Sequence, residues 1–462
     1  MSTPALLTKD NRLAAGKALR DRCPRGSHGK VVVGTRGERD VIALIEASNE
    51  DRLENLVPVR HGRMLQSPFA FFRGGAAIQA YDLADTPTSG IDVVACGDCH
   101  LLNFDGFATP ERNIVFDIND FDETSIAPFE WDLKRLAASF AVAARSRDFQ
   151  PDQVREIAVE SAAAYRETMH EHLHYSVLES WYSRITKDDI LALFRHDAEA
   201  LDRSKKIFAK AQRQTSEHVF EKLTTLADGP PRIVDQPPLL YHPHDPEVTD
   251  DTIETFFAAY RKTLPEERRL LFQRFRLVDV ALKVVGVGSV GTRCYIALFM
   301  ADANDPLFLQ VKEARRSVLE PYTGKTPVEH NGQRVVLGQR MMQSASDIFL
   351  GWAKVPAGRD YYVRQLRDMK MSAQVEAQSP QTMRSYARLC GKTLARAHDK
   401  AGDAAAIAGY LGENDDFDRA LGDYALAYAD QVERDYAAFS KAVRSGRLKS
   451  DLSENELATA LR

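Results

Sequence analysis

Two stretches that lie far apart in the sequence carry residue types that could transfer a phosphate group. In the first, GDCHLLNF, Asp98 is followed after four residues by Asn103. An aspartate can accept the proton of a substrate hydroxyl, and an asparagine five residues on can hold a metal ion. The nearby segment FDINDFDE adds Asp117, Asp120 and Asp122 at the end of a predicted strand. Such oxygens suit Mg²⁺, although the same pattern also forms solvated acidic turns.

The second stretch is a glycine-rich loop, GVGSVG, with Gly286, Gly288, Ser289 and Gly291. The residues that follow it alternate like a strand, whereas a dinucleotide-binding loop leads into a helix. No Gly-Lys-Ser/Thr follows, so the loop is not a Walker P-loop. A strand, this glycine pattern and a second strand cover the nucleotide phosphates in protein kinases. An ordinary glycine-rich hairpin remains the alternative.

A lysine follows the glycine loop at the distance that phosphate binding requires. Lys312 lies 21 residues after the last glycine, in the third predicted strand. A kinase-like site needs a lysine there to pair with the α- and β-phosphates. Lys283 precedes the loop, and we expect it to be a solvated strand lysine. The glutamate that holds such a lysine could be Glu313, Glu320 or Glu329, of which we favour Glu320.

Hydrophobic periodicity indicates which elements position these residues. Alternating apolar residues predict strands and a loop over about 91–122, and five further strands over about 276–367. A proline-rich segment near 229–246 predicts a linker. Most of the remaining chain has helical periodicity. The sequence therefore predicts an α+β protein with a small antiparallel-sheet lobe and a larger helical lobe.

Composition limits the class of protein. The 462 residues carry a net charge of -5 and are 44% hydrophobic, which is enough for two or more packing units. The mild acidity argues against a generic partner such as nucleic acid or an anionic membrane. No apolar run approaches a membrane span, and the first residues lack the apolar stretch of a secretory signal. Five cysteines favour a reducing compartment, so we expect a cytoplasmic protein. The oligomeric state is left open.

The motifs resemble those of a known group of enzymes. The segments around Asp98, Asn103 and Asp120, followed by PFEWDL, resemble the catalytic loop, metal-binding turn and next helix of aminoglycoside-phosphotransferase-like kinases. This resemblance implies that Asp98 is the catalytic base and Asn103 a metal ligand. It implies that Asp120 is the main metal ligand, because phenylalanine follows it, with Asp117 and Asp122 as alternatives. Asp132 would brace the catalytic loop, and ATP and Mg²⁺ would be the cofactors.

A second resemblance covers nearly the whole chain. The segments GDCHLLNF, FDINDFDET, PFEWDLKRLAAS, LQVKEA, GQRMMQSASDIFLGW, YYVRQLRDMK and LARAH resemble a bacterial family known as domain of unknown function 2252. Relative to ordinary kinases the motif order is changed, since the catalytic aspartate precedes the glycine loop. A circular permutation would explain this order. It implies a helical lobe over residues 1–270, a nucleotide-binding sheet lobe over 271–370, and helices over 371–462 that complete the helical lobe.

These observations lead to a functional hypothesis with alternatives. We expect an ATP- and Mg²⁺-dependent phosphotransferase of kinase-like fold, acting on a small-molecule or atypical hydroxyl acceptor. A nucleotide-binding pseudokinase, or an AMP transferase on the same fold, are the alternatives. His170, Glu171 and His174 match the HExxH pattern of zinc hydrolases, but a polar helix face is the simpler explanation. Cys96 and Cys99 could similarly suggest zinc or redox chemistry.

Overall fold

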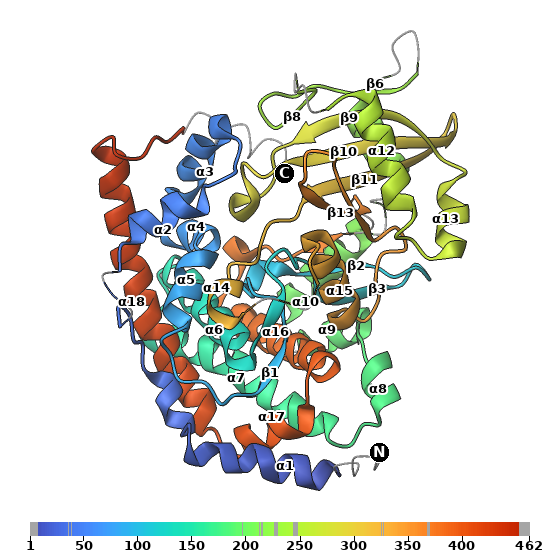
Figure 1. Cartoon of the computed structure of the whole chain (residues 1–462). Coiled ribbons are helices and arrows are strands. Elements are labelled where there is room, and N and C mark those ends of the chain that lie inside the picture. The colour runs from blue at the N-terminus through green and yellow to red at the C-terminus, as the bar shows by residue number, and fades with distance from the viewer. Residues whose placement is uncertain are drawn as a thin grey trace, which may run out of the picture.

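The computed structural model describes residues 8–451, except residues 36, 38, 196, 212, 214–215, 226–229, 244–247, 325, 327 and 367–369. The chain is a mixed α+β protein with antiparallel sheets (Figure 1). The helices are α1 (Lys9–Ala18), α2 (Val41–Ser48), α3 (Val57–Met64), α4 (Pro68–Gly74), α5 (Ala76–Leu83), α6 (Phe129–Arg145), α7 (Pro151–His172), α8 (Val177–Tyr182), α9 (Lys187–Leu193), α10 (Ala198–Ala211), α11 (Ser216–Leu223), α12 (Asp250–Arg261), α13 (Glu266–Phe272), α14 (Glu320–Thr323), α15 (Asn331–Met342), α16 (Pro380–Ala401), α17 (Ala404–Leu411) and α18 (Asp416–Arg444).

The larger sheet has the strand order β12-β13-β11-β10-β9-β8, and neighbouring strands are antiparallel. Its strands are β8 (Leu240–Tyr241), β9 (Arg276–Lys283), β10 (Cys294–Asp302), β11 (Asp305–Glu313), β12 (Gly351–Lys354) and β13 (Asp360–Gln365). The five strands expected over 276–367 are therefore confirmed. Their alternating apolar residues supply the two faces that the sheet buries.

Two smaller sheets flank the segment near residue 100. β1 (Asp92–Ala95) pairs with β4 (Ser125–Pro128), and β2 (Phe104–Ala108) pairs with β3 (Ile114–Ile118). β5 (Ile185–Thr186) and β14 (Met371–Ser372) extend the second pair to four strands. A further two-stranded pair joins β6 (Thr224–Thr225) and β7 (Arg232–Ile233). The strands and loop predicted over 91–122 are thus present as β1, β2 and β3, with β2 and β3 paired as a hairpin and β1 paired with the later strand β4.

The described part of the proline-rich segment is more ordered than a linker. Residues 230–243 contain β7 and β8, and β8 adds a sixth strand to the larger sheet by pairing with β9. Residues 229 and 244–246 of the predicted linker lie outside the described residues. The strand is only two residues long, and the flanking prolines hid it because they break the alternating pattern.

Helices from both ends of the chain build the main hydrophobic core. α7 lies against α16, and α18 runs along α6 and α7 and reaches α2 and α4 (Figure 1). A second core lies between the larger sheet and helices α12 and α13, where Phe257 and Phe272 both pack edge-on against Phe299. Burial of these apolar surfaces is the main favourable contribution to folding. Over the described residues, no helix combines the length and apolar character needed to cross a bilayer.

Candidate functional site

A cleft of about 1420 Å³ separates the larger sheet from the segment near residue 100, and α2 to α5 form part of its wall. Among the residues that the sequence singled out, ten line the cleft: Asp98, Asn103, Asp120, Asp122, Lys283, Gly286, Gly288, Ser289, Lys312 and Glu313. The two stretches of the sequence that carry candidate chemistry therefore face one cavity. Three other candidates, Asp117, Gly291 and Glu320, lie outside the described lining.

The loop that carries Asp98 is held by Asp132, which lies in the first turn of α6. Asp132 accepts hydrogen bonds from the backbone N–H groups of Cys96 at 2.7 Å and Gly97 at 2.9 Å. His398 Nε2 of α16 lies 3.2 Å from the same carboxylate. Gly97 has a φ of 83°, a conformation that favours glycine. The prediction that Asp132 braces this loop is confirmed by these bonds.

Asp98 itself is held by an arginine that the sequence did not single out. Arg135, one turn further along α6, donates to Asp98 Oδ1 from Nε at 2.8 Å and from Nη2 at 2.6 Å. Arg135 is buried, and it also donates to the side chain of Gln79 and to the carbonyl of Phe72. Asp98 Oδ2 lies 4.0 Å from His100. One carboxylate oxygen of Asp98 is therefore fixed in place by Arg135.

The side-chain amide of Asn103 has a defined orientation. Its Nδ2 donates to the backbone carbonyl of Asp98 at 2.6 Å. Its own backbone carbonyl accepts from the N–H of Asn119 at 2.9 Å, which ties this loop to the acidic turn. Because Nδ2 is the donor, Oδ1 is the atom of Asn103 that could bind a cation. Its buried position on the cleft wall suits this role.

Asp117 does not lie where a metal ligand in the cleft would need to be. It is fully buried, its Oδ1 pairs with Arg396 of α16, and its Oδ2 accepts from the N–H and hydroxyl of Ser344, each at 2.8 Å. Both oxygens are thus used to join β3 to the helices. Asp117 was one of the alternatives for metal binding, and its position assigns it instead to the core of the fold.

The other two carboxylates of the acidic turn meet the lysine of the larger sheet. Lys312 Nζ forms an ion pair with Asp122 and lies 3.8 Å from Asp120 Oδ2. Asp122 also accepts from Tyr362 at 2.8 Å and from Ser289 at 3.3 Å. Asp122 is therefore occupied by three donors, whereas the side chain of Asp120 keeps 30% of its surface exposed.

Burial and nearby charges explain the directions in which the pKa values of these three groups are shifted. Burial acts to raise the pKa of Asp122, but the charge of Lys312 and the hydrogen bonds from Lys312 and Tyr362 outweigh it and lower the pKa. Burial and the nearby charge of Asp122 together raise the pKa of Asp120. Burial alone would lower the pKa of Lys312, and the two carboxylates raise it well above its ordinary value. The ammonium group therefore stays charged and offsets part of the negative charge of the acidic turn.

The glycine loop covers the cleft between β9 and β10. Residues Val287–Ser289 form a short 3₁₀ turn, and the next regular element is a strand, as the sequence predicted. Arg52 donates to the carbonyl of Val290 and, at 3.0 Å, to the carbonyl of Gly288. The N–H of Leu53 donates to the carbonyl of Gly291 at 2.8 Å. Gly291 has a φ of 87°, so its role is a turn at the edge of the loop. The helical wall thus anchors the loop from outside.

Glu320 has different partners from those expected. It forms ion pairs with Arg316 at 2.9 Å and with Arg334 at 3.8 Å, whereas Lys312 pairs with the acidic turn. A second glutamate near the cleft, Glu123, accepts from the N–H of Val318 at 2.8 Å. Burial raises the pKa of Glu123 to about 7, although this hydrogen bond and Arg334 act against the shift.

Sequence analysis missed Arg135, Glu123 and Tyr362. The position of Tyr362 follows from strand pairing, because it is the direct neighbour of Lys312 across β11 and β13. Only the register between these two strands places the tyrosine beside Asp122, and no local pattern reveals that register. Arg135 could have been suspected, because it lies one turn beyond Asp132 in α6.

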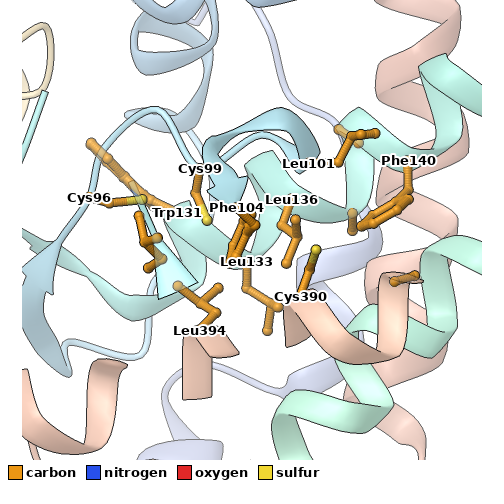
Figure 2. Packing of buried hydrophobic residues seen from close by; sticks show 14 of the residues in the cluster. Cys96, Cys99, Leu101, Phe104, Trp131, Leu133, Leu136, Phe140, Cys390 and Leu394 are labelled. Carbon is orange, nitrogen blue, oxygen red and sulfur yellow. The ribbon is translucent and has the colours of Figure 1, made fainter. Parts of the chain in front are cut away.

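The alternative metal sites have simpler explanations. α7 ends at His172, so His174 lies beyond the helix, and His170 Nε2 lies 2.8 Å from the carbonyl of Gly412. Within the described chain, the candidate metal-ligand cluster of His, Cys, Asp and Glu is Cys96, Cys99 and Asp132. Both thiols are packed in the apolar core (Figure 2), and burial raises the pKa of both, so they stay protonated. Asp132 is already used by the loop.

Comparisons with known proteins give the family of the chain. Searches among curated proteins and among solved structures found no match. The profile of a bacterial family, described as an uncharacterized protein conserved in bacteria, matches residues 52–442. This match spans both halves of the cleft, from the helical wall to the helices that brace the loop. The chain therefore belongs to the bacterial family known as domain of unknown function 2252.

Proposed function

We propose that this protein is an ATP- and Mg²⁺-dependent phosphotransferase that acts on the hydroxyl group of a small-molecule or atypical acceptor. One observation carries the proposal. Lys312 of the larger sheet pairs with Asp122, and Ser289 of the glycine loop donates to the same carboxylate. Asp98 and Asn103 thus share one cleft with a glycine loop suited to phosphate, the ammonium group of Lys312 and the acidic turn.

We further propose that the fold is a circularly permuted, bilobal protein-kinase-like fold. The antiparallel strands β9 to β11 carry the glycine loop and the lysine, and the helical part carries the loop of Asp98. If the chain order is followed as a circle, the elements occur in the kinase order. Helix α16, which contains LARAH, would precede the loop of Asp98 in an unpermuted chain, and Arg396 and His398 of this helix contact Asp117 and Asp132 beside that loop.

The residues of the cleft support in-line transfer of a phosphate group. Backbone N–H groups of the glycine loop and the ammonium group of Lys312 bind the nucleotide phosphates. Asp98 orients the acceptor hydroxyl and takes its proton, while Arg135 holds the carboxylate still. The acceptor oxygen forms a bond to the γ-phosphorus, the bond from this phosphorus to the β–γ bridging oxygen breaks, and ADP leaves. Positioning and charge stabilisation supply most of the catalysis in such reactions.

The donor atoms on the cleft wall fit a magnesium ion. Asp120 is a partly exposed carboxylate whose companion Asp122 is already paired, and Asn103 presents Oδ1 because its Nδ2 is bonded to Asp98. Hard oxygen donors of this kind are those that Mg²⁺ prefers, with phosphate oxygens completing its shell. The ion would supply neutralisation of the phosphate charge. Asp120 and Asn103 are therefore the proposed ligands.

A thermal-shift series with nucleotides tests the proposal. ATP with Mg²⁺ should raise the unfolding temperature, because a ligand that binds the folded state stabilises it by mass action. Mg²⁺ without nucleotide, and CTP or GTP with Mg²⁺, serve as comparisons. Absence of any nucleotide-dependent shift at millimolar ATP would remove the proposal.

Product analysis distinguishes the chemical alternatives. Mass spectrometry of a cell extract incubated with the protein, ATP and Mg²⁺ should show an acceptor that gains one phosphate group, together with ADP. A gain of AMP and release of pyrophosphate would identify an AMP transferase instead. Nucleotide binding without any product would identify a pseudokinase.

A further inference from the structure

Three arginines gather on the cleft wall that α2 and α3 form with the end of β11. Arg52 lies between α2 and α3, Arg60 lies in α3, and Arg315 follows β11 by two residues. All three line the same cavity as Asp98 and Lys312. We refer to Arg52, Arg60 and Arg315 as the arginine cluster.

The partners of the arginine cluster are neutral oxygens. Arg52 Nε donates to the carbonyl of Ser48 at 2.9 Å, and its Nη atoms donate to the glycine-loop carbonyls described above. Arg60 donates from Nη2 to the carbonyl of Gly74 at 2.8 Å and from Nη1 to Asn49 Oδ1. Arg315 Nη2 donates to the carbonyl of Glu50 at 2.6 Å. Within the described chain, none of the three guanidinium groups forms an ion pair with a carboxylate. Three positive charges thus share one wall without a directly paired carboxylate, although the charges of Glu123, Glu313 and Asp122 act on Arg52.

Arg60 is the most deeply buried arginine of the cluster. Its side chain is 1% exposed, and its Nε has no hydrogen-bond partner among the described atoms. Burial lowers the pKa of Arg60 well below its ordinary value, and the charges of Arg52 and Arg315 lower it further. Burial, followed by the charge of Arg315, also lowers the pKa of Arg52 to about 10, although the charges of Glu123, Glu313 and Asp122 act against this shift. Buried charges without a partner are costly, so a bound anion would stabilise this arrangement.

The chemistry of the cluster favours a phosphate group. Guanidinium groups offer planar, paired donors that match phosphate oxygens, and several of them can share one dianion. The nucleotide phosphates already have the glycine loop and Lys312 under the proposed function. The cleft of about 1420 Å³ also exceeds the about 300–1,000 Å³ of an ordinary ligand pocket. It has room for a second molecule beside the nucleotide.

We propose that the arginine cluster binds a phosphate group carried by the acceptor, so that the substrate is a phosphorylated compound with a free hydroxyl. The role of this substrate as the phosphate acceptor rests on the proposed function, whereas phosphate binding by Arg52, Arg60 and Arg315 does not. The cluster acts by holding the far end of the substrate, and Asp98 acts on its hydroxyl.

Phosphate titration of matched variants tests this proposal. Inorganic phosphate is the probe, and isothermal titration calorimetry measures its affinity for the full chain, alone and saturated with ADP and Mg²⁺. The variant is Arg315→Gln, because Arg315 is only half-buried and its loss spares the core. The control is Arg316→Gln, the next residue, which lines the same cleft but already pairs with Glu320. Arg60→Gln, which changes a buried side chain, is added after its folding is checked by circular dichroism.

The results separate three cases. Loss of about tenfold or more in phosphate affinity in Arg315→Gln, with Arg316→Gln unchanged and ADP without effect, supports the proposal. Equal phosphate affinity in the two variants overturns it. Competition between phosphate and a non-hydrolysable ATP analogue, but not ADP, would mean that the cluster holds the γ-phosphate, and it too would overturn the proposal. Failure of nucleotide to bind would remove the proposed function and leave the phosphate measurement without nucleotide intact.

Discussion

Arg135 donates two hydrogen bonds to a single oxygen of Asp98, over 2.8 Å and 2.6 Å, from its place one turn beyond the residue that braces the Asp98 loop. The bonds come from a buried guanidinium that is itself fixed by Gln79 and Phe72. The carboxylate is therefore held in one orientation before any substrate arrives. Such preorganisation suits the role of general base that we propose for Asp98.

Under the proposed function, Asp98→Asn should strongly slow phosphate transfer and spare nucleotide binding. The amide keeps the shape of the side chain but cannot accept the hydroxyl proton, so we expect the rate to fall by about 10²–10⁴-fold. The rate of ADP formation in the presence of the acceptor measures this loss, and a thermal shift with ATP and Mg²⁺ measures binding. A variant as active as the unmodified protein would rule out Asp98 as the base.

Lys312→Met should weaken nucleotide binding. The ammonium group is the charge that faces the phosphates in the proposed function, and its loss also leaves Asp120 and Asp122 without their shared counter-charge. We expect affinity for ATP and Mg²⁺ to fall by about tenfold or more. Lys354→Met is the control, since Lys354 lies in the same sheet, is 54% exposed and pairs with Asp360. If both variants bound ATP equally well, Lys312 would not be a phosphate ligand.

Arg396→Met should destabilise the fold strongly. Arg396 and Asp117 are 1% and 0% exposed, so removal of the arginine leaves a buried carboxylate without its partner. Loss of one member of such a pair costs about 3–5 kcal/mol. Arg384→Met on the same helix is the control, because Arg384 is 45% exposed and its pair with Glu160 should contribute at most about 1 kcal/mol. Urea unfolding of both variants gives the comparison, and equal midpoints would contradict the structural role of Asp117.

Gly97→Ala should damage the Asp98 loop. The alanine would have to adopt the φ of 83° that Gly97 has, and its Cβ would lie 2.2 Å from the backbone oxygen of Glu123. The backbone conformation alone costs about 1–2 kcal/mol, and the clash adds to it. Gly26→Ala is a suitable control, because a Cβ there meets no atom within 4 Å. The free energy of unfolding should fall clearly for Gly97→Ala and stay nearly constant for Gly26→Ala.

Glu123 should make stability depend on pH. Burial raises its pKa from 4.5 to about 7, so between these values the folded protein holds a proton that the unfolded chain has released. The free energy of unfolding therefore falls as pH rises through this window, by at most about 1.4 kcal/mol per pH unit from this group. Glu123→Gln should lack this contribution. Urea unfolding of both proteins from pH 4.5 to 8 tests it, and parallel pH profiles would contradict the shift.

Local sequence patterns predicted the secondary-structure elements well, whereas contacts between distant parts of the chain determine which side chains meet at the site. Alternation of apolar residues gave the strands between 276 and 365, and helical periodicity gave α6. The glycine loop, Lys312 and Asp98 were found because their spacing along the chain is short and characteristic.

Partners of charged residues could not be predicted in the same way. Glu320 was favoured as the partner of Lys312, but it lies beside Arg316 and Arg334. Asp117 and Asp120 are three residues apart and look alike in sequence, yet one is buried against α16 and the other lines the cleft. Such choices depend on which helix meets which strand, and contacts of that kind have large sequence separation and no local signature.

Helices α16 and α18, which brace the cleft, are synthesised after the described residues that line it. All described residues that line the cleft lie at or before position 370, while Arg396, His398, Asp435 and Tyr436, which hold the site loops and the N-terminal helices, lie in α16 and α18. A nascent chain on the ribosome would carry every proposed catalytic group before it could arrange them. Under the proposed function, competence to bind nucleotide should therefore appear only after α18 has left the exit tunnel.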